Sequence, residues 1–347
     1  MLAVLCNVVK EKMLSRKLKI FLNYFVGPIL FIWLSFSIYH QIKQQGDVQA
    51  SWQLIKVAFL GKSIWKILFV VLLMFVNWGI EARKWQILVS RVELISFNVA
   101  YRSILAGQAF ALNTINRTGD FVGRILYLKE GNRLRAVALS VVGSMSQTLV
   151  TFIIGFIALT GLRFSILNEL HSMEGLNQFW LDGLMIAMVI GILLLSVLYF
   201  NLNLFIQLLE RIPIIAKIRY FIEKLEALHW RELTRILLLS FLRYTIFIVQ
   251  YVLLLQVFGV EVGVLNLMML VAVLFLVLAM VPSIALAELG FRGKVSLQLF
   301  GLFSINHLGI IAAAAGIWII NLIIPAIAGS VLILSVKLFN NKLIRRE

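Results

Sequence analysis

Apolar stretches long enough to cross a membrane recur along this chain, and they constrain its fold more than any other feature. Ile20–Tyr39, Ile64–Ile80, Ala136–Leu162 and Trp180–Phe200 are examples. Of the 347 residues, 61% are hydrophobic and 14% are charged, and the mean hydropathy is +0.98. A soluble domain of this length does not have that balance, so the solvent implied is the hydrocarbon core of a bilayer. We therefore expect an all-α polytopic membrane protein with a single transmembrane domain over residues 1–347.

The basic surplus predicts how the chain is oriented in the membrane. Lys and Arg number 32 against 16 acidic residues, a net charge of +16. In a membrane protein such a surplus indicates positively charged cytoplasmic loops and attraction to anionic headgroups. No groove-reading, zinc or aromatic-stacking motif supports nucleic-acid binding. The basic run Lys10–Lys19 leads into a full-length span without a cleavage site, so it is not a signal peptide. We expect about eight crossings with both termini in the cytoplasm.

Residue counts and missing motifs argue against disulfides, metal sites and the common enzyme templates. Cys6 is the single cysteine, so a disulfide within the chain and a thiolate metal cluster are both excluded. The four histidines are scattered, which argues against a histidine-rich metal site. The nucleophile elbow, the HExxH zinc motif, the phosphate loop and the dinucleotide fingerprint are all missing. We expect no enzyme activity, no metal and no cofactor.

A polar, glycine-containing segment interrupts the apolar pattern between Asn113 and Arg135. Because glycines lie at 119 and 123, we do not expect one regular helix to run through the whole segment. Basic residues flank the short apolar stretch Phe97–Leu112 on both sides, so we expect a re-entrant hairpin instead of a crossing. Such a segment is tolerated at membrane depth where protein or a wet cavity satisfies its backbone.

The charges of this first interruption predict an ion pair and an anion site. Asp120 and Arg124 are four residues apart and share a helix face, so they can pair. Arg117 would then stay free beside the amide donors of the helix start, and would form an anion site with them. Charges inside a membrane cost about 2.5–3.5 kcal/mol each, so they persist when they are paired or wet. The alternative is that these residues lie at the cytoplasmic edge and set the topology.

A second interruption follows the apolar stretch Val264–Val281, which we expect to be a crossing. It runs from Pro282 to Lys294 and repeats the spacing of four between Glu288 and Arg292. Val295–Phe303 would be a half-length helix after it. The alternative is a self-paired helix start that is capped after Pro282. Paired interruptions in the two halves of a chain indicate a site of discontinuous helices near the midplane.

Polar residues also lie on single faces of two predicted spans. The first set, spaced by 4, 3 and 4 residues, is Ser140, Ser144, Gln147 and Thr151. The second set is Ser240, Arg243, Phe247 and Gln250. Hydrogen bonds between helices explain the serines as well as a binding site does. Arg243 lies about two turns inside its span, so it must reach a carboxylate, water or a headgroup phosphate.

Three stretches of the sequence resemble those of a known protein family. They are Asn-Arg-Thr-Gly-Asp-Phe-Val-Gly-Arg at 116–124, the span that follows it, and Pro-Ser-Ile-Ala-Leu-Ala-Glu-Leu-Gly-Phe-Arg at 282–292. The sequence resembles the lysylphosphatidylglycerol synthase transmembrane-region family, also called flippase-like domain proteins. The resemblance implies about eight spans with broken helices, and transfer of a phospholipid between leaflets. The soluble aminoacyltransferase domain of the full synthases is not in this sequence, so lipid aminoacylation is not expected.

From the residues and the resemblance we expect a protein of the bacterial cytoplasmic membrane that binds an anionic or zwitterionic phospholipid and moves it between leaflets. Its partners would be membrane lipid and the bilayer. A non-catalytic partner or regulator of an envelope biosynthetic enzyme is the alternative, and a membrane enzyme acting on lipid-linked sugar is a third hypothesis. The candidate substrate-binding residues are Asn116, Arg117, Gly119, Asp120, Arg124, Gln147, Arg243, Pro282, Ser283, Glu288 and Arg292.

Overall fold

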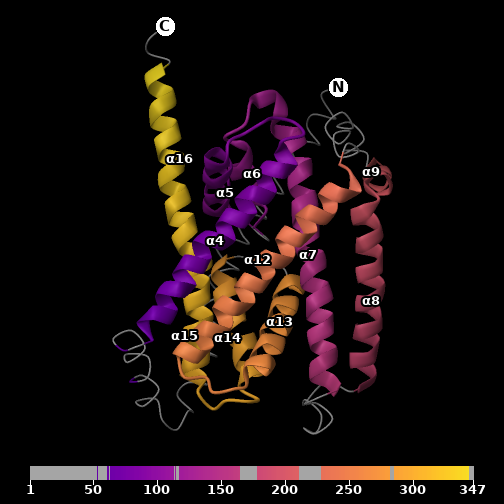
Figure 1. The fold of residues 1–347 in the computed structure, drawn as a ribbon, viewed down its shortest axis with the longest axis vertical. Helices are drawn as coiled ribbons and strands as arrows, with labels where there is room; N and C mark the ends of the chain where they lie inside the picture. Colours follow the sequence, from indigo (N-terminus) through magenta and orange to yellow (C-terminus); the bar gives the residue numbers. More distant parts are fainter. Residues whose placement is uncertain are drawn as a thin grey trace, which may run out of the picture.

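The computed structural model describes residues 53, 61, 63–112, 114, 117–164, 178–210, 228–281 and 285–343, and every regular element in these ranges is helical. The long helices are α4 (Ile64–Val89), α7 (Arg133–Leu162), α8 (Gln178–Phe200) and α12 (Trp230–Val257). The others are α5 (Phe97–Ala111), α6 (Gly119–Ile125), a 3-10 turn η3 (Glu130–Asn132), α9 (Leu202–Glu210), α13 (Val264–Met280), α14 (Ala285–Phe300), α15 (His307–Trp318), a π-helical segment η6 (Ile319–Ile323) and α16 (Ile324–Leu343). Figure 1 shows their arrangement. The all-α prediction is confirmed.

Five segments of the described chain are long and apolar enough to cross a membrane. They are Ile64–Val89, Glu130–Leu162, Asp182–Phe200, Trp230–Val257 and His307–Ile333. At 1.5 Å per residue, even the 19 residues of the shortest segment extend roughly 28 Å, close to the thickness of the hydrocarbon core. Large apolar side chains on α8 are exposed, Leu193 and Leu194 by 60% and 61%. Such a face suits lipid and not water. The predicted span Ile20–Tyr39 lies outside the described residues.

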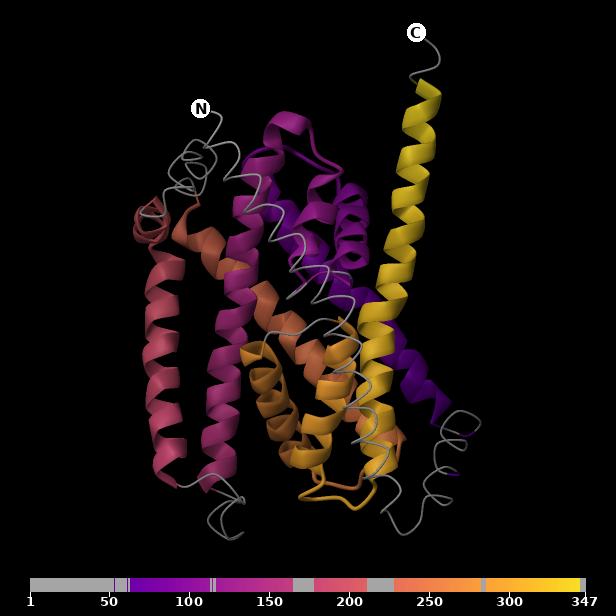
Figure 2. The same ribbon diagram turned by 180° about the vertical axis from the view of Figure 1, so that it is seen from behind.

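Two pairs of short helices lie between the long ones. The 15 residues of α5 extend about 22 Å, less than the bilayer core, and α6 packs against it as the second arm of a hairpin. The helices α13 and α14 form the other pair. In Figures 1 and 2 the α5–α6 hairpin occupies the upper half of the molecule and the α13–α14 hairpin the lower half. The two interruptions thus lie in two helical hairpins, and the re-entrant placement of the first hairpin stays a prediction.

The second hairpin corrects one predicted boundary. The predicted crossing Val264–Val281 is the apolar helix α13, whose 17 residues are at the short end for a transmembrane helix. The half-length helix does not begin at Val295, because α14 already begins at Ala285 and ends at Phe300. The polar side chains of Glu288 and Arg292 therefore lie on the helix and not in a break before it. They can do so because an ion pair between them compensates their charges.

Glycines in the first hairpin serve close packing and do not break the helix. The helix α6 begins at Gly119 and continues through Gly123, contrary to the expected punctuation at these positions. A Cβ on Gly123 would collide with the backbone of Ala106 on α5, and one on Gly119 would collide with the carbonyl of Phe110. The change in backbone direction occurs instead at Arg117, whose φ of 57° is left-handed.

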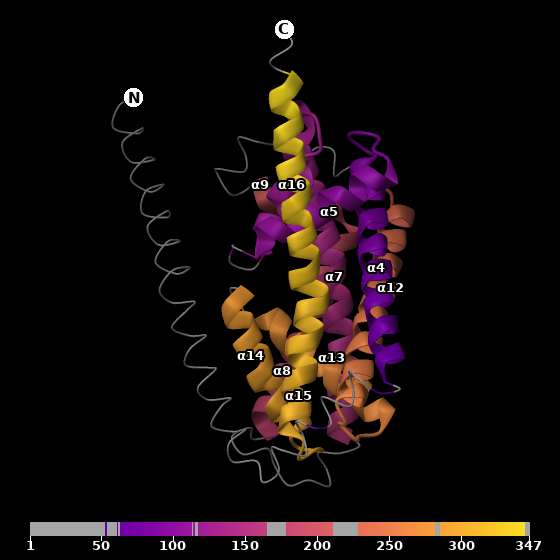
Figure 3. The ribbon, with the colours of Figure 1, turned by 90° about the vertical axis from the view of Figure 1, so that its left-hand side faces the viewer.

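The last helical run contains a π-helical segment where it passes the hairpins. The π-helical segment Ile319–Ile323 lies directly before α16, which carries Pro325 in its first turn. Proline lacks the N–H that would bond the carbonyl four residues earlier, and a π segment accommodates the missing bond. Figure 3 shows α16 running along α5. A Cβ on Gly329 would collide with the carbonyl of Leu105, so these two helices lie in direct backbone contact.

The apolar core lies where α4, α7, α12 and α13 meet. Trp85, Leu139, Ile236 and Leu274 are each completely buried in it. In Figure 1, α4 and α12 run side by side and obliquely across the other helices, in agreement with their extensive contact. These two helices therefore pass both hairpins and can carry side chains to the place where the hairpins meet.

Candidate functional site

Glu81 on α4 is the centre of a buried ion-pair cluster. One of its carboxylate oxygens lies 2.8 Å from Lys84 Nζ and 3.0 Å from Arg243 on α12, and the other lies 2.9 Å from Arg124 on α6. The side chain of Glu81 is 3% exposed. Because an unpaired charge at this depth is strongly unfavourable, the three cations hold α4, α6 and α12 together. This single carboxylate therefore joins a long helix pair to the first hairpin.

Arg124 is held from two sides. Its guanidinium lies 2.5 Å from Asp120 one turn earlier on α6, so the predicted pair is confirmed. It also lies over the ring of Trp85, 5.8 Å from the centroid, in a cation–π contact. Glu81 is its second carboxylate, so Arg124 pairs with carboxylates on both α6 and α4. Its place is that of a brace between α6 and α4.

The two hairpins meet at Glu288. Its carboxylate accepts hydrogen bonds from Arg117 at 2.8 and 2.9 Å and from Arg292 at 2.8 Å. The pair Glu288–Arg292 was predicted and is confirmed. The expectation that Arg117 stays free is wrong, because the left-handed backbone at this residue directs its side chain to the other hairpin. The interruption near 117 and the one near 288 thus converge, 171 residues apart in the sequence.

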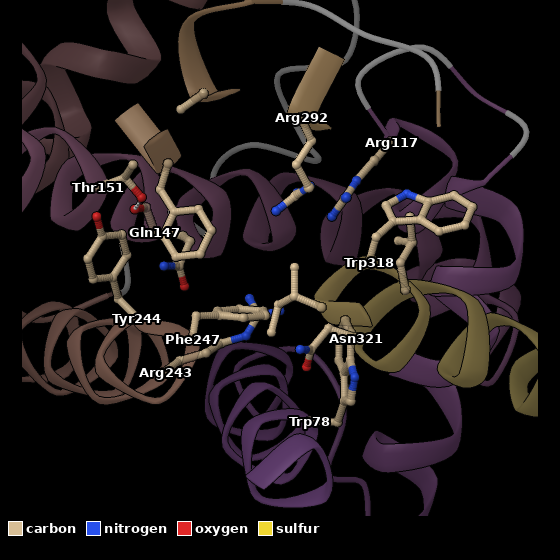
Figure 4. A pocket seen from close by; sticks show the side chains of 14 residues that line it. Trp78, Arg117, Gln147, Thr151, Arg243, Tyr244, Phe247, Arg292, Trp318 and Asn321 are labelled. Carbon is tan, nitrogen blue, oxygen red and sulfur yellow. Dashed lines mark hydrogen bonds between the residues drawn. The ribbon is translucent and has the colours of Figure 1, made fainter. Parts of the chain in front are cut away.

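A cavity of about 230 Å³ lies where these elements meet. Arg117, Arg243 and Arg292 line it, each from a different element. Figure 4 shows the guanidinium groups of Arg117 and Arg292 directed toward the cavity, with Arg243 across from them. The other lining residues are Trp78, Gln147, Thr151, Tyr244, Phe247, Phe275, Ala279, Ile317, Trp318, Asn321 and Leu322. No acidic residue of the described chain is among the lining residues, although carboxylates hold the arginines from behind.

Arg243 is held in place by two hydrogen-bond acceptors and two aromatic rings. Its Nε donates to the amide oxygen of Asn77 at 2.8 Å, and one terminal nitrogen bonds Glu81. The guanidinium lies over the rings of Trp78 and Phe247, at 5.0 and 5.3 Å from their centroids. Two rings and two acceptors fix its plane, so a ligand would meet a preorganised donor.

Hydrogen-bond donors in the wall have no partner among the described residues. They are the indole N–H groups of Trp78 and Trp318 and the Nε of Arg292. The unpartnered acceptors in the wall are two neutral amide oxygens, those of Gln147 and Asn321. Buried polar groups are almost always hydrogen-bonded in the working state of a protein. A wall of arginines and free N–H groups fits a ligand rich in acceptor oxygens.

The candidate residues from the sequence separate into three groups. Arg117, Gln147, Arg243 and Arg292 line the cavity. Asp120, Arg124 and Glu288 lie behind the wall as ion-pair partners, and Gly119 packs against α5. Asn116, Pro282 and Ser283 lie outside the described residues.

One donor of the predicted anion site at the start of α6 has a partner within the protein. The backbone N–H of Gly119 donates to the hydroxyl of Thr114 at 2.7 Å. That donor is therefore occupied within the protein. Arg117 lines the cavity beside Arg292.

The polar faces of α7 and α12 divide between packing and the cavity. Ser140 and Ser144 donate to carbonyls of their own helix, so neither bonds across helices. The hydroxyl of Ser240 on α12 lies 2.7 Å from that of Ser146 on α7. Ser240 therefore takes part in a hydrogen bond between helices, which was the alternative to a role in binding. Gln147 is the residue of the α7 face that contributes an amide to the wall.

Sequence reasoning missed Glu81, and it misplaced Lys84. A span that ended at Ile80 would leave Lys84 outside it, but the side chain of Lys84 is 1% exposed and donates to the carbonyl of Gly143 and the hydroxyl of Ser240, each at 3.3 Å. The helix continues to Val89, so the charge lies inside the span. The available signal was the spacing of three between Glu81 and Lys84, which places opposite charges on one helix face.

Comparison with known protein families supplies the identity of the fold. Residues 20–329 match the family described as the lysylphosphatidylglycerol synthase TM region. The chain belongs to this family. The matched range contains both hairpins and every residue of the cavity wall. Membership makes the chain an integral membrane protein of a lipid-related family. The comparison with curated proteins found no match.

Proposed function

We propose that the protein binds the phosphate of a membrane lipid in this cavity and moves that lipid between the two leaflets. The observation that carries the proposal is the wall itself: three arginines line it, and no lining residue in the described chain is acidic. Guanidinium groups bind phosphate oxygens through short, charge-assisted hydrogen bonds. A headgroup bound there would keep hydrogen-bond donors around its charge as it crosses the hydrocarbon region. The free-energy barrier would be lower than for a headgroup that crosses the lipid without protein.

The two hairpins support movement in addition to binding. They come from opposite halves of the molecule and meet at the pair Arg117–Glu288, beside the cavity. Discontinuous helices of this kind surround midplane substrate sites in transporters, where access alternates between the two sides. The pair Arg117–Glu288 would separate and re-form as the hairpins move, because a phosphate competes with the carboxylate for the guanidinium.

The proposed setting is the bacterial cytoplasmic membrane, with both termini on the cytoplasmic side and membrane lipid as the partner. The turn between α6 and α7 carries Lys129 and Arg133, and the start of α12 at the same end carries Arg231 and Arg235. Lys and Arg concentrate on the cytoplasmic side of membrane proteins. We propose a transport protein without enzyme activity, because the cavity wall is built for binding.

The test is lipid movement in vesicles that contain the purified protein and a headgroup-intact fluorescent phosphatidylglycerol. Dithionite quenches dye in the outer leaflet, so movement appears as quenching beyond about half of the signal. Arg292→Gln should slow movement about tenfold or more, because it removes a charged donor from the wall. Glu288 keeps Arg117 as a partner in this variant, so the fold should persist.

Arg83→Gln is the matched control. Arg83 lies on the exposed side of α4 and donates to Gln86, away from the cavity. The control should move lipid at the wild-type rate. A folded Arg292→Gln protein that also moves lipid at that rate would remove the cavity from the pathway. A wild-type protein that binds lipid without moving it would favour the alternative of a non-transporting partner of an envelope enzyme.

A further inference from the structure

The charges around the cavity do not balance. Two ion-paired groups together form what we call the charge cluster: Lys84, Arg124 and Arg243 with Glu81 and Asp120, and Arg117 and Arg292 with Glu288. Within the described residues this cluster therefore carries a surplus of two positive charges. A surplus at membrane depth is unfavourable unless a counter-charge enters.

The sharing of carboxylates places the surplus at the cavity wall. Arg117 and Arg292 share Glu288, while Arg243 shares Glu81 with Lys84 and Arg124. Asp120 serves Arg124, which lies behind the wall. The three arginines that line the cavity thus each have less than one carboxylate, as does Lys84, which lies outside the wall. A ligand in the cavity would contact all three.

We infer that the cavity selects a lipid whose headgroup is a doubly charged terminal phosphate, over phosphodiester lipids and over lipids that carry an amine. This inference rests on the proposed function, in which a lipid headgroup enters the cavity. A phosphomonoester carries a charge of about −1.5 to −2 at pH 7, which matches the surplus. A phosphodiester carries one charge and balances half of it.

An amine has no partner in this wall. The lining acceptors without partners are the neutral amide oxygens of Gln147 and Asn321, and the lining charges are all positive. An ammonium group would meet arginines and indole N–H donors, so it would be repelled. The apolar part of the wall, which includes Phe275, Ala279 and Leu322, suits the first carbons of a lipid better than a free phosphate ion.

Binding from a defined mixture tests the inference. The full-length protein in detergent is given phosphatidic acid, phosphatidylglycerol and phosphatidylethanolamine with identical chains in equal amounts, and the bound lipids are counted by native mass spectrometry. At pH 8 phosphatidic acid should exceed phosphatidylethanolamine by about tenfold. At pH 5 its advantage over phosphatidylglycerol should vanish, because the phosphomonoester loses its second charge as the pH falls through about 6.

Gln147→Glu tests the charge balance directly. It places a carboxylate in the wall with little change of shape and lowers the surplus from two to one, so the preference for phosphatidic acid at pH 8 should fall severalfold. Gln298→Glu is the matched control, because Gln298 is exposed on α14 and outside the cavity. An unchanged preference in a folded Gln147→Glu protein would overturn the inference.

Two further outcomes separate this inference from the proposed function. Equal binding of the three lipids at pH 8 would overturn the selectivity, while lipid movement in vesicles could still be observed. Displacement of phosphatidic acid by an equal concentration of glycerol 3-phosphate would show that the site takes a free phosphate ester, which overturns a lipid ligand. Absence of both binding and movement would overturn the inference together with the function.

Discussion

At the scale of single residues, the protein keeps its buried charges by sharing carboxylates. Glu81 serves three cations and Glu288 serves two, and both lie within 3.0 Å of each partner. Within the described residues, three carboxylates in this way serve five cations, of which Arg117 is partly exposed. Glu81 is therefore the more important of the two carboxylates, because its loss affects three cations and the loss of Glu288 affects two.

Glu81→Gln should therefore be strongly destabilising. The substitution keeps the shape of the side chain and removes the counter-charge of Lys84, Arg124 and Arg243 together. Removal of one partner from a buried ion pair costs roughly 3–5 kcal/mol of unfolding free energy. The loss can be measured by denaturant titration of the purified protein in detergent.

Glu261→Gln supplies the comparison for that measurement. Glu261 is exposed in the turn between α12 and α13, so its neutralisation should change the unfolding free energy by less than about 0.5 kcal/mol. Equal stability of the two variants would mean that Glu81 does not hold the three cations.

At the scale of elements, the first hairpin depends on the absence of side chains along one line of contact. Gly123 of α6 lies against the backbone of α5 at Ala106, and Gly107 of α5 lies against Asp120. The helices approach closely enough for Asp120 and Arg124 to reach Glu81 on α4. Glycine here is a packing residue, and its effect passes to the charge cluster through the position of α6.

Gly123→Ala should disturb this hairpin. The added methyl group collides with backbone atoms that cannot move aside, and overpacking of this kind costs typically 1–3 kcal/mol. We expect a lower melting temperature and slower lipid movement, because α6 must shift and takes Arg124 with it.

Gly131→Ala is the matched control, since nothing lies within 4 Å of a Cβ added there. It lies in the short turn that follows the same hairpin, and it should melt as the wild type does. If the two alanine variants melt together, the close contact between α5 and α6 does not contribute to stability.

At the scale of the whole molecule, the two ends differ in charge. The end that carries the α6–α7 turn and the start of α12 is rich in Lys and Arg. At the opposite end Arg163 is paired with Asp182, and Glu261 lies in the α12–α13 turn. The hairpins enter from these two ends and meet between them. Orientation in the membrane therefore decides which hairpin faces the cytoplasm.

Single cysteines at Gly131 and Gly263 should report that orientation. Nothing lies within 4 Å of a Cβ at either position, so both substitutions should be tolerated. In a background with Cys6→Ser, the cysteine at position 263 should react with a membrane-impermeant maleimide in intact cells. The cysteine at position 131 should react after permeabilisation, because the basic end is expected in the cytoplasm. The reverse pattern would invert the orientation of both hairpins.

The sequence by itself determined those features that depend on neighbours along the chain. Apolar runs of spanning length specify an all-α membrane protein, because a bilayer accepts backbone whose hydrogen bonds are internal. The pairs Asp120–Arg124 and Glu288–Arg292 follow from helical spacing alone, since residues four apart share a face. The two interruptions could also be predicted, because each is a polar stretch between apolar runs of the sequence.

The tertiary structure decided which of these charges meet across the molecule. Arg117 reaches Glu288 over 171 residues, and Arg243 reaches Glu81 over 162. Local spacing cannot specify such contacts, because they depend on how rigid helices cross and on one left-handed residue that redirects a side chain. The same crossing angles place Arg124 behind the wall and Gln147 in it. The sequence thus specified the charge pairs within single helices, and helix packing decided which of the charged side chains face the cavity.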